Sequence, residues 1–274
     1  MKDLTLTRAR KIAFVVFVSL LLGLAVSAFT PLGQRVAAQY LSKQLRARLA
    51  ARPVMTAAVP MFATLTVTNL NDSGAGSLRQ AITDAVAGDT ITFSITGTIT
   101  LASELAINKN LTIQGPGVNA LTISGNSASR VFNISAGNYN VAISNLTIAN
   151  GRARGANGPN SSTPRDDGEG GWLYNASTGT LTLTNCILSS NTAAGGSGFG
   201  GPTASAGGHA RGGGIFNAST GRIDLINSTL SGNAATGGAG GSGAAGRNGG
   251  NGDGGGIYNA STGIVTLTNS TLSS

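Results

Sequence analysis

Charged and aromatic residues are scarce in this 274-residue chain, at 10% and 5%, and it contains one cysteine and one histidine. An ordinary soluble domain has about 25% charged residues. A single cysteine, Cys186, excludes an internal disulfide. The sequence also has no zinc-type ligand spacing, no P-loop and no G-x-S-x-G motif. We therefore expect no cofactor, and a fold that is stabilised by burial and backbone pairing.

Proline is also scarce, at 7 residues, whereas glycine is abundant, at 42 residues. This glycine content is about twice the usual share. Because the glycines have no three-residue period, a collagen triple helix is excluded.

The net charge of +8 at first suggests a nucleic-acid-binding protein. Residues 1–53, however, contain nine basic side chains and one acidic side chain, whereas residues 54–274 contain nine of each. The body of the protein is therefore neutral, and we expect no nucleic-acid partner.

Residues 1–30 have the layout of a signal peptide or a signal anchor. An apolar run from Ile12 to Ala28 follows four basic side chains, and Val26-Ser27-Ala28 or Val36-Ala37-Ala38 is suitable for cleavage. A cleaved signal is the favoured interpretation, and an uncleaved anchor remains open because this run is near the lower limit for spanning a bilayer. Residues 31–63 are predicted to be a basic helical linker. The membrane is thus the expected partner of the N-terminus, and the protein is expected to be secreted or located at the cell surface or outer membrane.

Near-identical 42-residue repeats between residues 171 and 274 determine the predicted fold. Short runs in which leucine or isoleucine alternates with polar residues predict strands, and a strand pattern that repeats in register predicts a β-solenoid. Asparagines recur with the repeat, and we expect them to form structural ladders, with glycan contact as the alternative. These asparagines are Asn175, Asn217, Asn259, Asn185, Asn227 and Asn269.

The strand pattern begins earlier, so residues 64–274 are predicted to be one parallel β-helix. Ser77 is suited to cap a short helix whose apolar face, including Leu78 and Ile82, would cover the first coil. The glycine-rich stretches 193–213 and 234–255 are expected to be loops outside the core that project from one corner. The last repeat stops at Leu272-Ser273-Ser274, so we expect the C-terminal end of the solenoid to be incomplete, with further domains of the same protein beyond it.

Several segments resemble the bacterial right-handed parallel β-helix repeat proteins of the pectin-lyase-like superfamily. These segments are VTNLNDSGAGSLRQAITDAVAGDTITF, LTIQGPG and the NASTG-type repeats. The elements Gly213-Gly214-Ile215-Phe216-Asn217 and Gly255-Gly256-Ile257-Tyr258-Asn259 are similar to polymorphic outer membrane protein-type repeats. They depart from that pattern because the aromatic residue and the asparagine are adjacent. The resemblance implies the fold and leaves the activity open, since the superfamily includes lyases, hydrolases and non-catalytic surface proteins.

The chemistry-bearing residues of the body are few. Asp166, Asp167 and Glu169 cluster and could bind a cation, but a solvated loop tip is the favoured interpretation. His209 is a weak candidate for a general base, and Cys186 and Asp224 are interpreted as variants of the repeat. We therefore assign no catalytic, cofactor-binding or metal-binding residue.

Two functions remain. The leading prediction is a non-catalytic, adhesin-like surface solenoid that forms a rigid stalk with outward glycine-rich loops, and its ligand would be an extracellular glycan or a cell-surface molecule. The alternative is a polysaccharide lyase or glycoside hydrolase. The alternative requires Asp166, Asp167, Asp224 or His209 to converge with an arginine.

Overall fold

The computed structural model describes residues 62–157, 166–243 and 246–273, together with residues 35, 39–40 and 42–44. Contacts divide the chain into two units, Met1–Pro60 and Met61–Ser274. The predicted signal segment lies outside the described residues, and the few described linker residues are helical. Among the residues that are described, no helix is long and apolar enough to cross a membrane.

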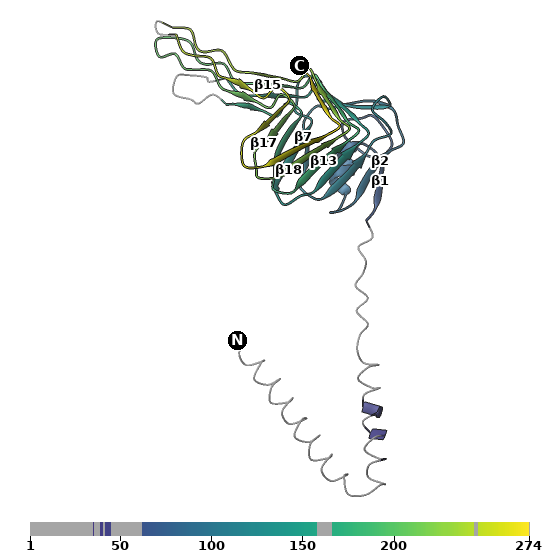
Figure 1. Ribbon diagram of the computed structural model, residues 1–274. Coiled ribbons are helices and arrows are strands. Elements are labelled where there is room, and N and C mark those ends of the chain that lie inside the picture. The colour runs from purple at the N-terminus through teal and green to yellow at the C-terminus, as the bar shows by residue number, and fades with distance from the viewer. Residues whose placement is uncertain are drawn as a thin grey trace. The chain divides into compact units, whose positions relative to one another are not determined.

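The second unit is a right-handed parallel β-helix, which confirms the solenoid that the repeats predict and the form that the resemblance implies (Figure 1). Three parallel sheets run along the stack, and each complete coil adds one strand to each sheet. Sheet A contains β1 (Thr64–Val67), β2 (Thr90–Phe93), β5 (Leu111–Gln114), β8 (Val141–Ser144), β13 (Thr180–Thr184), β18 (Arg222–Ile226) and β23 (Ile264–Thr268). Sheet B contains β3 (Gly97–Thr100), β6 (Leu121–Ser124), β9 (Thr147–Ala149), β14 (Ile187–Ser189), β19 (Thr229–Ser231) and β24 (Thr271–Ser273). Sheet C contains β4 (Leu105–Ile107), β7 (Phe132–Gly137), β12 (Leu173–Ser177), β17 (Ile215–Asn217) and β22 (Ile257–Asn259).

The core lies between the three sheets. Leu181 and Leu183 of β13 pair in register with Ile223 and Leu225 of β18, and all four side chains are buried. The residues between them, such as Thr182, point outward, as expected for a strand with one buried face. Stacking therefore places apolar residues on apolar residues along the whole solenoid.

A single asparagine turns the chain from sheet A into sheet B in four coils. Asn145, Asn185, Asn227 and Asn269 have φ angles of 54°, 51°, 50° and 49°. Asparagine adopts this left-handed conformation more readily than most other residues with a side chain. The corner is thus made in one residue, and the backbone continues to pair across coils through it, as from Asn185 N to the Ile226 carbonyl.

The predicted capping helix is α3 (Leu78–Asp84), at the N-terminal end of the stack. The Ser77 hydroxyl caps it by accepting a hydrogen bond from the backbone N–H of Gln80 at 3.2 Å. The helix buries one apolar face against the first coil, through Leu78, Ala81 and Ile82.

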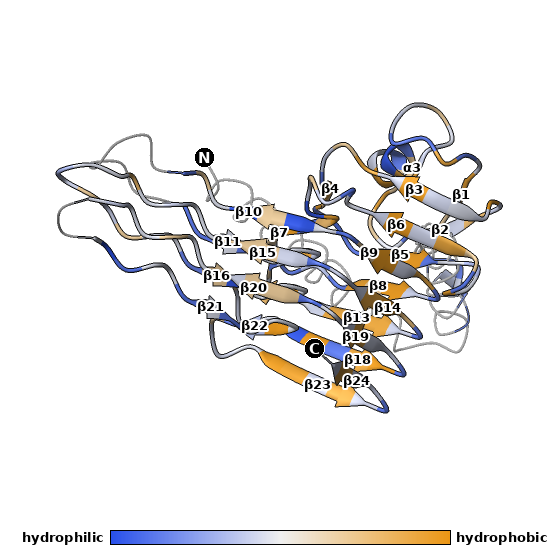
Figure 2. Ribbon diagram, turned by 90° about the horizontal axis from the view of Figure 1, so that it is seen from above, coloured by the Kyte–Doolittle hydropathy of each residue, from blue (hydrophilic) through white to orange (hydrophobic). Residues whose placement is uncertain are grey.

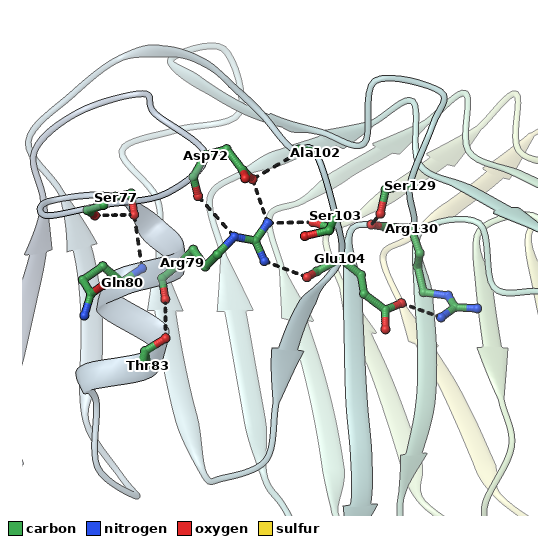
Figure 3. Close-up of polar contacts among 11 residues, drawn as sticks. Asp72, Ser77, Arg79, Gln80, Thr83, Ala102, Ser103, Glu104, Ser129 and Arg130 are labelled. Carbon is green, nitrogen blue, oxygen red and sulfur yellow. Dashed lines mark hydrogen bonds and ion pairs between the residues drawn. The ribbon is translucent and has the colours of Figure 1, made fainter.

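Side chains on both sides of the junction fasten this cap to the solenoid (Figure 3). Arg79 Nη2 donates to an Asp72 carboxylate oxygen and to the Ser103 carbonyl, both at 2.7 Å, and Arg79 Nη1 donates to the Glu104 carbonyl at 2.8 Å. Lys109 Nζ donates to the Ala85 carbonyl at 2.7 Å, where the helix ends. The cap is therefore held by directional contacts in addition to its buried face.

The glycine-rich stretches leave the solenoid after sheet B and return to sheet C, and together they form a projection that we call the fin. It comprises the described residues of 152–170, 192–213 and 234–255, in three layers that extend to one side of the stack (Figure 2). The outgoing strands form one parallel sheet, and the return strands form another. The outgoing strands are β10 (Arg152–Arg154), β15 (Thr192–Ala194) and β20 (Ala234–Thr236), and the return strands are β11 (Gly168–Glu169), β16 (Ala210–Arg211) and β21 (Gly252–Asp253).

The fin has a backbone core of its own, which composition alone did not predict. Gly208 N donates to the Gly196 carbonyl within one layer, and Gly238 N and Gly250 N continue the pattern into the next layer, at 2.8–2.9 Å. Gly196 and Gly208 are buried, and a Cβ on either would collide with backbone atoms. Glycine is therefore required by close backbone packing, and these segments are paired layers rather than free loops.

Candidate functional site

Several chemistry-bearing residues of the repeats meet at the root of the fin, where its return strands run into sheet C. Glu169, Arg211 and Asp253 stand in register in β11, β16 and β21. Two residues earlier, Asp167 and His209 occupy equivalent places in successive layers. We call Asp167, Glu169, His209 and Arg211 the root cluster. The sequence indicated the carboxylates and the histidine, and the 42-residue period brings them together.

Arg211 binds both carboxylates of the preceding layer. Its Nη1 lies 2.6 Å from an Asp167 carboxylate oxygen and 3.1 Å from a Glu169 carboxylate oxygen. The other carboxylate oxygen of Asp167 accepts a hydrogen bond from the His209 backbone N–H at 2.7 Å. One guanidinium and two carboxylates thus tie two layers of the fin together.

The electrostatics of Arg211 oppose a role in proton abstraction. Burial lowers the pKa of this guanidinium, but hydrogen bonds and charge from Asp167 and Glu169 outweigh burial and raise the pKa above its ordinary value. A base must be able to lose its proton near the working pH. Arg211 is therefore suited to holding anions, and it is poorly suited to removing a proton from a sugar ring.

Aromatic side chains stack beside the root cluster on the outer face of sheet C. The rings of Tyr174, Phe216 and Tyr258 follow one another with centroids 5.5 and 5.6 Å apart. Arg130 lies over the Tyr174 ring at 5.3 Å, and Arg211 lies over the Tyr258 ring at 5.9 Å. Both arginines combine a charge with a flat hydrophobic surface, and these contacts join the root of the fin to the solenoid.

Arg130 extends this polar network toward the N-terminal cap. Its Nη1 lies 2.7 Å from a Glu104 carboxylate oxygen, and its other nitrogens donate to the Gly170 and Glu169 carbonyls at 2.9 and 2.7 Å. Sequence reasoning missed Arg130 and the aromatic stack. The stack could have been inferred, because its three aromatics follow the same 42-residue period as the asparagines.

Of the three acidic residues that could bind a cation, two converge on an arginine. Asp166 is exposed, and Asp167 and Glu169 both contact Arg211. In the part of the chain that the structure describes, no group of three histidine, cysteine or acidic side chains could hold a metal ion. A guanidinium occupies the place that a cation would need, which makes the cluster an ion-pair network.

The repeated asparagines fall into two structural classes. Asn175 Nδ2 donates to Asn217 Oδ1, and Asn217 Nδ2 donates to Asn259 Oδ1, both at 2.8 Å, so these three side chains form a ladder.

The second asparagine column differs from the expected ladder, because its members serve the sheet A to sheet B corner through their backbone. Asn185 Nδ2 reaches Asn145 Oδ1 at 3.2 Å, and among the described residues no side-chain hydrogen bond joins Asn185, Asn227 and Asn269 to one another.

The remaining candidates are also engaged in structure. Cys186 is buried, and burial raises the pKa of its thiol although backbone hydrogen bonds oppose this change. It occupies the place of Ser228 in the next coil, whose hydroxyl accepts a hydrogen bond from the Cys186 N–H at 3.1 Å. Asp224 pairs with Arg222 on the outer face of sheet A at 2.7 Å, away from the root cluster.

No known family model matches this chain, and no curated protein sequence matches it either.

Proposed function

We propose that this protein is an exported, non-catalytic β-solenoid of the cell surface, with an adhesin-like role in which the solenoid supports the fin. We also propose that it belongs to the bacterial pectin-lyase-like β-helix proteins. The resemblance of its repeats and cap segment supports this assignment, together with its stacked parallel sheets. Its partner would be an extracellular glycan or a cell-surface molecule, and its localisation would follow from the N-terminal signal segment.

The observation that carries the proposal is that the carboxylates of the root cluster are engaged in ion pairs. Within the fin, Asp167 and Glu169 are acidic side chains that successive layers bring within reach of an arginine, and Arg211 engages both of them. Carboxylates that are held in this way fasten the fin layers, whereas a hydrolase needs one carboxyl group that is free to donate a proton. The arrangement supports a scaffold that presents a surface.

Labelling of intact source cells tests the surface assignment. Antibodies against residues 64–274 should label cells that have not been permeabilised, and brief protease treatment should remove the label while an internal marker protein survives. Label that appears only after permeabilisation would contradict the proposed localisation.

The alternative is a polysaccharide lyase or glycoside hydrolase, and the convergence of Asp167 with Arg211 beside His209 is the observation that favours it. A panel of acidic polysaccharides, assayed for new reducing ends and for unsaturated products, separates the two functions. We expect no turnover by the full chain. Turnover that Asp167→Asn abolishes, while Asp224→Asn leaves it unchanged, would replace the leading proposal with the enzymatic one.

A further inference from the structure

The return strands of the fin are linked by one repeated contact, in which a side chain accepts a hydrogen bond from the backbone N–H of the equivalent residue in the next layer. Asp167 Oδ1 accepts from His209 N at 2.7 Å, and His209 Nδ1 accepts from Asn251 N at 3.0 Å. Elsewhere Asn140 Oδ1 accepts from Thr180 N in the same way, at 2.9 Å. The contact therefore recurs in the fold, and its acceptor is an oxygen at Asp167 and Asn140 but a ring nitrogen at His209.

We propose that His209 is a pH-sensitive fastener between the second and third layers of the fin. A neutral imidazole accepts a hydrogen bond only at its unprotonated nitrogen, so the Asn251 contact requires Nδ1 to be free of a proton. Imidazole gains a proton between pH 8 and pH 5, and both of its nitrogens then donate. Protonation therefore converts the acceptor into a donor that faces another donor, and the link to Asn251 is lost.

Charged side chains lie on the return strands around His209. On the side of β11 are the carboxylates of Asp167 and Glu169, on the side of β21 is Asp253, and Arg211 lies on its own strand. The neighbouring outgoing strands β15 and β20 contain only threonine and alanine. A proton on Nδ1 would act on this arrangement through the Asn251 contact.

The consequence is local. Asn251 and Gly252 are exposed, and β21 pairs with β16 over only two residues, so this return strand is less restrained than the strands of the solenoid. In sheet A, β13 pairs with β8 over four residues and with β18 over five, and Leu181 and Leu183 of β13 are buried. Acidification should therefore open the third return strand of the fin while the solenoid stays folded.

Hydrogen exchange of the Asn251 amide in the full chain, divided by its intrinsic rate at each pH, tests this inference. Between pH 7.5 and pH 5.0 we expect its protection to fall by about fivefold to tenfold, which is the effect of losing one hydrogen bond. The amides of β13 should keep their protection over the same range. Constant protection of Asn251 would overturn the proposal.

Two variants separate the histidine from its acidic neighbours. His209→Asn places an amide oxygen where Asp167 already presents one to the next layer, so protection of Asn251 should become independent of pH. Asp167→Asn retains His209, so the fall should persist. A pH-dependent fall in His209→Asn, or its disappearance in Asp167→Asn alone, would assign the effect to the carboxylate and overturn the role of His209. Unchanged β13 amides establish that each variant is folded.

Discussion

At the scale of single residues, the same amino acid with the same 42-residue period does two different jobs. Asn217 is fully buried, with Oδ1 accepting from Asn175 and Nδ2 donating to the Gly221 carbonyl and to Asn259. Asn227 is exposed at the corner with a φ angle of 50°. The repeat predicted that both positions matter, but only the backbone geometry distinguishes a side-chain role from a conformational one.

We therefore expect opposite responses to substitution at these two positions. Asn217→Ala leaves the buried Asn175 amide and the buried Gly221 carbonyl without the Asn217 partner, so the free energy of unfolding should fall by about 1–3 kcal/mol for each of these two groups. Asn227→Gly keeps a residue that tolerates positive φ, so its change should stay within about 0.5 kcal/mol. Urea unfolding followed by circular dichroism measures both variants. Equal losses of unfolding free energy in the two variants would show that the buried ladder contributes no more to stability than the corner residue does.

At the scale of elements, the solenoid strands and the capping helix could be predicted, whereas the order within the fin could not. Alternating leucines such as Leu181 and Leu183 indicate a strand because burial depends on side chains. Segments such as 193–213 contain too few side chains to carry such a pattern, and composition alone is typical of a loop. Their pairing depends on backbone atoms that approach closely where a Cβ is missing, as at Gly196 and Gly208. This information becomes visible only when successive layers are superimposed.

Adding one methyl group tests whether the fin is held by close backbone packing. In Gly196→Ala the new Cβ would collide with the Ala156 carbonyl, so exchange of the Gly208 amide, which donates to Gly196, should accelerate by at least about tenfold. Gly246→Ala is the matched control, because a Cβ there meets no atom within 4 Å. Amide exchange read by mass spectrometry compares the two variants. Identical exchange of the Gly208 amide in both variants would mean that the layers can move apart without losing their backbone hydrogen bonds.

At the scale of the whole β-helix unit, one 42-residue period corresponds to one coil together with its fin layer. Coils contact the coils before and after them, so the stability of such a solenoid is close to a sum over neighbours. The register is strict where repeats meet, since Leu173, Tyr174 and Asn175 pair with Ile215, Phe216 and Asn217. The same period could have predicted the root cluster, because it superimposes Glu169 on Arg211. The acidic and basic residues looked isolated only because they were considered along one stretch of chain.

Removal of one whole period should therefore be tolerated. Deletion of residues 175–216 joins Tyr174 to Asn217 and leaves every remaining coil in register, so the chain should fold with one coil fewer and a lower free energy of unfolding. Deletion of residues 175–195 removes half a period and places glycine-rich fin residues where β13 of sheet A and β14 of sheet B belong. Size-exclusion chromatography and far-ultraviolet circular dichroism distinguish a soluble, strand-rich product from an aggregate. Aggregation of both deletions would contradict the additivity of coils.

The fin also changes how the unit grows. About half of each 42-residue period leaves the solenoid as a fin layer, and only the remainder winds around the core. One more repeat would raise the stack by a single strand spacing, about 4.8 Å. It would also add a complete layer to the fin. Each added repeat therefore lengthens the stack by one coil and thickens the fin by one layer. Its lateral surface, rather than its tip, gains most from each duplication of the repeat.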